Sequence, residues 1–533
     1  MVEQKEEVET EPIRRFRRGE ARMAKALKEA PTRRLLLLGL CISVILYALI
    51  HTRDAVVDSD LWWLLETGRQ IVENGIPYAN PWSIHEGQGI VVQQWLSAML
   101  LYLLYELGGA LELQVLVCIQ AALLVAALCR LIYVCSKGQM ASDTALCLVA
   151  AITPALSIYW STRPHLWTML AYTLLLTCLE KFRWKGDSRS LYPIPFIVAL
   201  HVNLHASMAL IDPLICCAYL LPSVATIRKL APFRLTARGE SPAAAIIGTR
   251  ILGIITALSA LSLMLNPYGL KGAIYSILSY GSASYGGYIS EMSSAEIWSP
   301  FGASYLICAL AFAFLLGKAE PSKHPLSYFA LPSIFLILSI MHTRNIWLFP
   351  LFSLPWVSFQ LRYFSPSSLL PDFLTGVVPS SIAILVCFAV LSYGSNGYFE
   401  AFDIEDAVDD CATTPKAAID FIEENGLAGA DVMCTFDSGG YLEWHGMKVD
   451  MDARPELWEP GITGLDAHYY RDYVDRDQDC ETDYSSYIES NDFKLILIPS
   501  GNSAIDYVED NPDWEIEAYG PGYTFWAKKT LFD

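Results

Sequence analysis

Charged residues are scarce in this sequence. Asp, Glu, Lys and Arg make up 17% of its 533 residues, whereas 53% are hydrophobic. A soluble globular protein carries roughly 25% charged and about 45–50% apolar residues. The composition therefore argues against an ordinary soluble protein and predicts many apolar helices in a membrane.

Several motifs of well-known chemistry are also absent. The sequence has no Cys-x-x-Cys or Cys/His metal spacing, no Walker loop, no dinucleotide fingerprint and no Ser–His–Asp order. It has no convincing internal repeat, which argues against a transporter built from inverted halves. These absences give no support to the zinc-binding, nucleotide-binding, serine-hydrolase or transporter classes.

The 13 cysteines fall into two groups. Ten lie in apolar runs or at their ends, where a thiol acts as a small hydrophobic group. Cys411, Cys434 and Cys480 lie in an acidic region, where either one disulfide forms among them or all three are free thiols.

The charge is divided unevenly along the chain. From Asn396 to the end there are 32 acidic and 8 basic residues, a net charge of −24, whereas residues 1–395 carry 24 acidic and 29 basic ones, a net charge of +5. This division predicts a membrane body followed by a water-exposed acidic domain. Nucleic acid is excluded as a partner, because its phosphates would be repelled.

The apolar runs predict about eleven membrane-spanning helices, each near the 20 residues that a bilayer requires. They cover residues 35–50, 112–134, 144–160, 165–180, 190–204, 208–225, 249–265, 302–317, 326–342, 345–361 and 373–394. The run 95–107 is interpreted as a helix on the outer surface, since counting it as a span would place the later basic loops on the wrong side.

The predicted fold class is an α-helical polytopic membrane protein with a C-terminal soluble α/β domain, located in the plasma membrane. Residues 1–34 form a basic cytoplasmic segment with no small-residue cleavage site after the first apolar run. Residues 35–394 form the transmembrane domain, which includes a first outer loop at 51–112, and residues 395–533 form an extracytoplasmic domain.

The first outer loop carries Asp58 and Asp60 directly before a tryptophan pair. The pattern of residues 60–74 predicts an amphipathic helix on the membrane surface, with Trp62 and Trp63 at the headgroup level. The two carboxylates are then held at the outer surface of the membrane.

The predicted topology brings several other polar turns to the same face. They carry Arg163, His165, Asn203, His205, Asn266, Glu291, Arg344 and Asn345. Ionisable groups at membrane depth are costly and usually face a cavity or a partner. We therefore expect one pocket that also includes the Asp pair.

The acidic region predicts a small α/β domain, because helical and strand patterns alternate along it. Helices are expected at 414–426 and 503–511, and strands at 430–436, 493–499, 514–520 and 523–529. Residues 441–452 are interpreted as a hairpin, and 473–483 is too acidic to assign.

The segment "DSDLWWLLETGRQIVENGIPYANPWS", which begins at Asp58, resembles the first outer loop of bacterial membrane proteins with the GT-C glycosyltransferase architecture. Further matches follow in order: "QQWLSAMLLYLLYELGG", "TRPHLWT", "NLHAS", "LNPYGL", "TRNIWLF", "GGYLEW" and "VDMDARPELW", which ends at Trp458. The resemblance implies the GT-C fold, a polyprenyl-phosphate sugar donor and transfer on the outer side of the membrane. The ordered set carries it, since no single motif is specific.

The chain departs from that family's pattern at three places. Leu64 stands where the family often has His, Asn80 where it often has Asp, and Gln93 and Gln94 where it often has His-Glu. These departures put a second acid/base group in doubt.

Glycosyl transfer requires a group that takes or orients the acceptor proton, and cationic donors that hold the departing phosphate. Asp60 or Asp58 suits the first task, and Arg163 and Arg344 suit the second. His165, His205, Glu291 and Asn345 are the supporting candidates, and Asp58, Asp60 and Glu291 form a candidate site for Mg²⁺ or Mn²⁺.

Each candidate has a structural alternative. Arg163 is either a phosphate ligand or an interfacial anchor, His165 and His205 either line the site or cap helix ends, and Arg344 and Asn345 either bind or simply open a helix. For His85 and Glu86 a solvated turn is favoured over a role in the site, and Asp437, Asp450, Asp452 and Arg454 are expected to be structural, with Asp452 and Arg454 as an ion pair.

The predicted function is an inverting membrane glycosyltransferase that moves a sugar from a polyprenyl-phosphate donor to an envelope glycan, lipid or protein. The alternative is a non-catalytic protein of the same fold that binds a lipid-linked glycan or an envelope-assembly partner.

Overall fold

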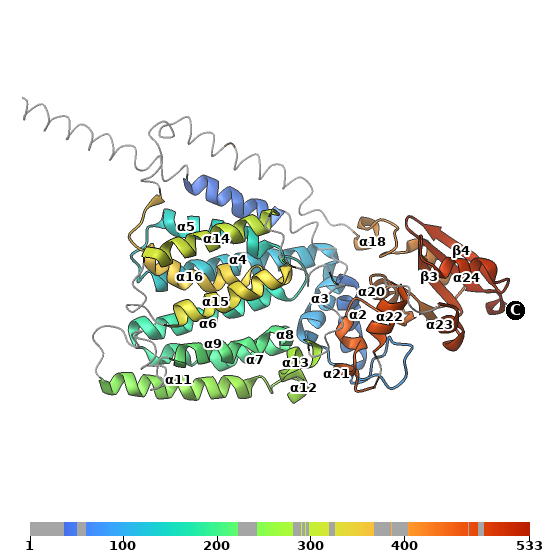
Figure 1. Cartoon of the computed structure of the whole chain (residues 1–533), viewed down its shortest axis with the longest axis horizontal. Helices are drawn as coiled ribbons and strands as arrows, with labels where there is room; N and C mark the ends of the chain where they lie inside the picture. Colours follow the sequence, from blue (N-terminus) through green and yellow to red (C-terminus); the bar gives the residue numbers. More distant parts are fainter. Residues whose placement is uncertain are drawn as a thin grey trace, which may run out of the picture.

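The computed structural model describes residues 37–50, 60–221, 242–280, 298–318, 326–366, 403–466, 468–477 and 484–532, together with Ile289, Ser294 and Leu385. Most of these residues are helical. A helical bundle forms one end of the molecule and a small sheet forms the other (Figure 1). Between them lie α2 (Leu61–Asn74), α3 (Trp95–Gly108), α13 (Tyr275–Tyr280) and α20 (Gly439–Trp444).

The bundle helices form at the apolar runs of the sequence. A helix covers residues 37–50, and α4 Ala110–Cys135, α5 Ser142–Ser157, α6 His165–Lys185, α7 Ile194–Leu204, α8 Ala206–Ala209, α9 Ile211–Leu220, α11 Pro242–Ser262, α14 Pro300–Lys318, α15 Ser327–Met341 and α16 Leu348–Gln360 follow. Helix α4 packs on α6, α5 on α14, and α15 on α16. Buried aliphatic and aromatic side chains fill the contacts, and their many van der Waals contacts stabilise the bundle.

Helix length does not confirm the predicted count of eleven spans. Among the described residues, α4, with 26 residues, is long and apolar enough to cross a membrane. Seven other apolar helices have 10–17 residues, including the one at Trp95–Gly108 that we interpreted as a surface helix. The predicted span at 373–394 lies outside the described residues, apart from Leu385.

The first outer loop contains α2 Leu61–Asn74 and α3 Trp95–Gly108, which pack closely against each other. A Cβ atom added at Gly68 would lie 2.3 Å from the carbonyl oxygen of Ala98, so this contact requires glycine. The predicted headgroup position of the tryptophans is wrong. Trp62 and Trp63 are 2% and 6% exposed, because protein covers this face of α2.

The covering protein is the C-terminal domain, whose five-stranded sheet has the order β2-β1-β3-β5-β4. The strands are β1 Asp431–Met433, β2 Lys448–Val449, β3 Leu495–Pro499, β4 Trp514–Gly520 and β5 Tyr523–Lys528. Strands β2, β1 and β3 are parallel, and β5 is antiparallel to both β3 and β4. The larger helices are α19 Lys416–Glu424, α22 Tyr469–Asp477, α23 Tyr484–Ser490 and α24 Ala504–Asp510.

The predicted hairpin at 441–452 is wrong. Residues Gly439–Trp444 form helix α20, and the strand that follows, β2, pairs with β1 in parallel. The outer loop extends the sheet beyond β2, since the amide of Val449 donates to the carbonyl of Trp82 at 2.8 Å and the amide of Ile84 donates to that of Val449 at 3.1 Å. The loop and the C-terminal domain are therefore joined by backbone pairing.

Candidate functional site

A cavity of about 260 Å³ lies where the bundle, the outer loop and the C-terminal domain meet. The outer loop contributes Asp60, Trp63, Leu64, Gln93 and Gln94; the bundle side contributes Arg163, Pro164, His165, His205, Ser207, Tyr275, Ser279, Ile289 and Arg344; the C-terminal domain contributes Phe436, Asp437, Ala453, Arg454, Pro455 and Glu456. Segments nearly 400 residues apart thus share one polar site.

Asp60 and Arg163 form an ion pair in this cavity. Asp60 precedes the first turn of α2, and its Oδ2 lies 3.1 Å from Nε of Arg163, which comes from the turn before α6. The indole nitrogen of Trp63 donates to Asp60 Oδ1 at 3.2 Å. The side chains of Asp60 and Arg163 are 20% and 17% exposed, so both remain accessible from the cavity.

The structure brings five of the eight predicted site residues to the cavity, namely Asp60, Arg163, His165, His205 and Arg344. Asn345 ends a short 3-10 helix at Thr343–Asn345, and its backbone carbonyl accepts from the hydroxyl of Ser339 at 2.7 Å. It is not part of the cavity lining. Asp58 and Glu291 lie outside the described residues.

His165 is buried in the cavity wall without a hydrogen-bond partner among the described residues. It is 6% exposed, its ring stacks on Tyr159 at 4.1 Å, and it meets the ring of His205 edge-on at 4.9 Å. A buried imidazole with two unsatisfied nitrogens is costly, which indicates a position that a bound polar molecule would satisfy.

The residues that depart from the family pattern have structural contacts here. The carbonyl of Gln93 accepts from the amide of Ala206 at 2.8 Å, and its side-chain oxygen accepts from the amide of Ser207 at 3.0 Å. Asn80 accepts from the amide of Trp82 at 3.1 Å and donates to Gln88 at 3.1 Å. Leu64 is fully buried at the cavity wall. Gln93 therefore fixes the turn that carries His205.

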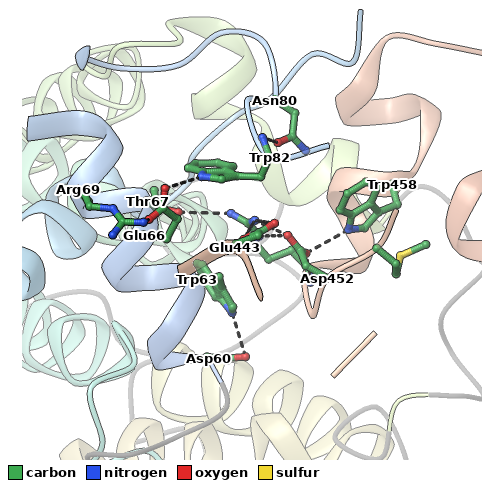
Figure 2. A network of polar contacts seen from close by, with 12 residues as sticks. Asp60, Trp63, Glu66, Thr67, Arg69, Asn80, Trp82, Glu443, Asp452 and Trp458 are labelled. Carbon is green, nitrogen blue, oxygen red and sulfur yellow. Dashed lines mark hydrogen bonds and ion pairs between the residues drawn. The ribbon is translucent and has the colours of Figure 1, made fainter. Parts of the chain in front are cut away.

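Arg454 joins the C-terminal domain to α2 through a buried polar network. Its partners Thr67, Glu443 and Asp452 are labelled in Figure 2. Its guanidinium donates to Asp452 at 2.8 Å through Nε and to Glu443 at 2.9 and 3.0 Å through Nη2, and it reaches Thr67 of α2 at 3.3 Å. Its charge lies 5.0 Å from the ring centre of Trp63, a cation–π distance. The ion pair expected between Asp452 and Arg454 is present.

Glu66 of α2 belongs to the same interface. Its Oε1 accepts from the indole nitrogen of Trp82 at 2.8 Å, and it pairs with Arg69, which in turn donates to the carbonyl of Trp444 at 2.7 Å (Figure 2). Burial raises the pKa of Glu66 despite the opposing effects of Trp82 and Arg69.

The pKa values of the two carboxyl groups that share Arg454 are shifted in opposite directions. Burial raises the pKa of Glu443 well above its ordinary value, and attraction to Arg454 does not offset this. Burial also acts on Asp452, but the charge and hydrogen bonds of Arg454 outweigh it and lower the pKa of that carboxyl. These shifts favour the ionised form of Asp452 beside the cationic Arg454 and favour the protonated form of Glu443.

The candidate metal site is largely outside the described residues. Two of its three members, Asp58 and Glu291, are not described, and the carboxylate of Asp60 is in contact with Arg163 and Trp63. Within the described part of the chain, no group of three or more His, Cys, Asp or Glu side chains is placed to hold a metal ion. Binding of Mg²⁺ or Mn²⁺ stays a prediction.

The remaining predictions have mixed outcomes. His85 is half-buried and stacks on Tyr469 at 3.8 Å, and burial lowers its pKa to about 4, whereas Glu86 is exposed in the turn, as expected. Cys411 and Cys434 are free thiols, and Cys480 lies outside the described residues.

Sequence reasoning missed several residues that support the cavity. Tyr275 donates to Glu456 at 2.7 Å across the cavity wall, and Thr168, His201 and Asp212 lie behind His205. The signal for His201 and Asp212 was present, since both are ionisable residues within apolar runs.

Comparisons with known proteins give little beyond this geometry. No family model and no curated protein matches the sequence. Among solved structures, the chain matches the crystal structure of the Archaeoglobus fulgidus oligosaccharyltransferase, described as a complex with Zn and sulfate, with 13% identity and a TM-score of 0.43. The match covers 86% of this chain and 68% of that one.

Proposed function

We propose that this chain is a membrane glycosyltransferase, which moves a sugar from a polyprenyl-phosphate donor to an envelope glycan, lipid or protein acceptor at the outer face of the membrane. The observation that carries the proposal is the Asp60–Arg163 ion pair in a cavity that Arg344, His165 and His205 also line.

Each side chain has a chemical task in this proposal. Arg163 and Arg344 hold the phosphate of the donor, because a guanidinium binds phosphate oxygens in a bidentate manner and stabilises the charge that develops on departure. Asp60 orients the acceptor hydroxyl or takes its proton. The apolar helices beside the cavity accommodate the polyprenyl tail.

The wall formed by the C-terminal domain suits a role in acceptor binding. The C-terminal domain brings the carboxylates of Asp437 and Glu456 to the cavity, and its Arg454 is paired with Asp452, whereas Arg163 and Arg344 come from the bundle side. Sugar hydroxyls donate to carboxylates, whereas the donor phosphate would be repelled by them. The cavity therefore has a cationic side for the donor and an anionic side for the acceptor.

The test is mass spectrometry of surface glycans and glycolipids from cells with and without this chain. A glycoconjugate that depends on this protein should fall by about a hundredfold or more with Asp60→Asn, because a loss of that order is expected whether Asp60 orients the acceptor hydroxyl or takes its proton. Glu73→Gln, an exposed carboxylate on the same helix, is the matched control and should leave the product unchanged.

Two further variants separate the enzyme from the non-catalytic alternative. Arg163→Lys should retain part of the activity and Arg163→Gln almost none, because the charge matters in addition to the geometry. If Asp60→Asn and Arg163→Gln accumulate normally in the membrane and the glycan profile is unchanged, the chain is not a transferase and the binding protein is the better description.

A further inference from the structure

A buried chain of hydrogen bonds runs from the cavity into the bundle. His205 Nδ1 lies 2.8 Å from the hydroxyl of Thr168, the same hydroxyl lies 3.0 Å from Nε2 of His201, and His201 Nδ1 lies 2.8 Å from Oδ2 of Asp212. The exposed fractions of Thr168, His201, His205 and Asp212 are 0%, 1%, 2% and 0%. His205 is the member of this chain that lines the cavity.

We propose that His205 takes the proton of the acceptor hydroxyl during transfer, and that Thr168, His201 and Asp212 are positioning residues that prepare it and store the proton. This proposal rests on the proposed glycosyltransferase function and leaves Asp60 to orient the acceptor.

The Thr168 hydroxyl fixes the donor-to-acceptor direction along the hydrogen-bond chain. A hydroxyl has one hydrogen to donate, so Thr168 can donate to one of its two imidazole neighbours and must accept from the other. When Asp212 is ionised and His201 carries its proton on Nδ1, Nε2 of His201 accepts from Thr168. Thr168 then accepts from the Nδ1 hydrogen of His205, which leaves Nε2 of His205 as a lone-pair acceptor.

That acceptor is available to a molecule in the cavity. The Nδ1 edge of the His205 ring is engaged with Thr168 of α6, so Nε2 is on the ring edge that a bound group can reach. Burial lowers the pKa of His205 well below its ordinary value, and the nearby His201 and Arg344 act in the same direction, which disfavours an extra proton on His205 before the acceptor binds.

The hydrogen-bond chain accommodates one additional proton without losing a hydrogen bond. If Nε2 of His205 gains a proton, its Nδ1 proton passes to Thr168, and the hydroxyl hydrogen of Thr168 passes to Nε2 of His201. His201 becomes an imidazolium, which the carboxylate of Asp212 stabilises at 2.8 Å. The positive charge is thereby moved away from the cationic side of the cavity.

The transfer step balances with this arrangement. The bond between the sugar C1 and the phosphate oxygen breaks, and its electron pair leaves with the polyprenyl phosphate held by Arg163 and Arg344. The acceptor oxygen forms the new bond to C1, and its proton goes to Nε2 of His205. Release of that proton to water after product departure restores the chain.

The first experiment needs no substrate. Nitrogen-15 NMR of the histidine rings is recorded on the full-length protein in lipid nanodiscs, with His205 assigned from its absence in His205→Gln. The wild type should show His205 protonated at Nδ1 and bare at Nε2. Thr168→Val should change the tautomer of His205, whereas Thr168→Ser should preserve it because the hydroxyl remains.

A matched control comes from the same helix. Thr173 is a buried threonine of α6 that donates to the carbonyl of Met169 at 2.7 Å and takes no part in the chain, so Thr173→Val should leave the His205 signals unchanged. A proton on Nε2 of His205 in the wild type, or the same tautomer in Thr168→Val, would overturn the proposal.

The second experiment measures, in isolated membranes, the formation of the glycoconjugate that depends on this protein. His205→Gln should reduce it about a hundredfold, Thr168→Val at least about tenfold and Thr168→Ser less than about threefold. If Asp60→Asn abolishes the product while Thr168→Val leaves it at the wild-type level, the proton chain is wrong and the glycosyltransferase function stands. If no variant alters the glycan profile, the function itself is wrong, while the NMR result still decides the tautomer.

Discussion

Arg454 shows how one buried cation can set opposite charge states on two neighbouring carboxyl groups. It binds both Asp452 and Glu443, yet its charge lowers the pKa of Asp452, while burial raises that of Glu443 well above its usual range. One cation balances one anion, since two ionised carboxylates beside a single guanidinium would leave a net charge in an apolar site. The interface that forms the cavity wall therefore depends on this one-to-one balance.

This balance predicts different effects of two similar substitutions. Glu443→Gln should change the thermal unfolding midpoint little, because Gln resembles the protonated carboxyl that it replaces. Asp452→Asn should destabilise by about 3–5 kcal/mol, since it leaves the Arg454 charge without its anion. Differential scanning fluorimetry of the two variants in the same detergent decides the matter, and an equal loss in both would contradict the assignment.

The pH dependence of stability provides a further check on Glu443. Its raised pKa means that the folded protein keeps a proton that the unfolded chain loses above about pH 4.3. Stability contributed by this group therefore falls as pH rises from that value towards the raised pKa. Glu443→Gln should remove this part of the slope in a series of unfolding midpoints measured from pH 5 to pH 8, and an unchanged slope would contradict the raised pKa.

At the scale of an element, α20 is placed by its two glycines. A Cβ atom at Gly439 would lie 2.0 Å from the carbonyl oxygen of Met451 and 2.8 Å from Cα of Asp452, and one at Gly440 would lie 3.2 Å from Cβ of Trp63. The first contact is with backbone, which cannot turn aside as a side chain can. The close approach of Gly439 to the backbone of Met451 and Asp452 thus requires glycine, and it places Glu443 of α20 in the interface.

We therefore expect Gly439→Ala to destabilise the protein clearly and to weaken the docking of the C-terminal domain on α2. Gly317, in α14, has nothing within 4 Å of an added Cβ, so Gly317→Ala should be neutral or stabilising by up to about 1 kcal/mol. Unfolding midpoints and protease resistance of the two variants provide the comparison. Equal behaviour would mean that helix propensity rather than packing governs both positions.

The same element shows where sequence reasoning succeeds and fails. Long apolar runs identified the bundle helices, because a continuous hydrophobic pattern is a local signal. The hairpin expected at 441–452 failed because the partner of β2 is β1 and the outer loop, which the local alternation of residues does not reveal. Trp62 and Trp63 were predicted at the lipid surface because no local pattern reveals that a segment nearly 400 residues later covers them.

The site was more predictable than these interfaces. Arg163, His165, His205 and Arg344 lie at helix ends, and the alternation of helices brings their turns to one face. Thr168 and His201 could not be assigned in this way, since their roles depend on side-chain contacts between helices.

At the scale of the whole molecule, α6, one of the spans predicted from the sequence, would relate the cavity to the membrane. It begins at His165 in the cavity wall and ends with Arg183 and Lys185 in its last turn, 21 residues on. That length corresponds to about 31 Å, close to the roughly 30 Å of a bilayer's hydrocarbon core. If α6 crosses the membrane, the cavity and the basic end lie on opposite sides, and basic residues favour the cytoplasm.

This relation predicts the accessibility of two introduced thiols. In intact cells a membrane-impermeant maleimide should label Ser500→Cys, an exposed position of the acidic domain. It should label Lys185→Cys only after the cells have been permeabilised. The wild-type protein, with its 13 native cysteines, sets the background. If Lys185→Cys is labelled in intact cells and Ser500→Cys is protected, the cavity lies on the cytoplasmic side. That result would contradict transfer at the outer face. The expected pattern instead places the cationic wall, the acidic domain and His205 together on the side where envelope acceptors are found.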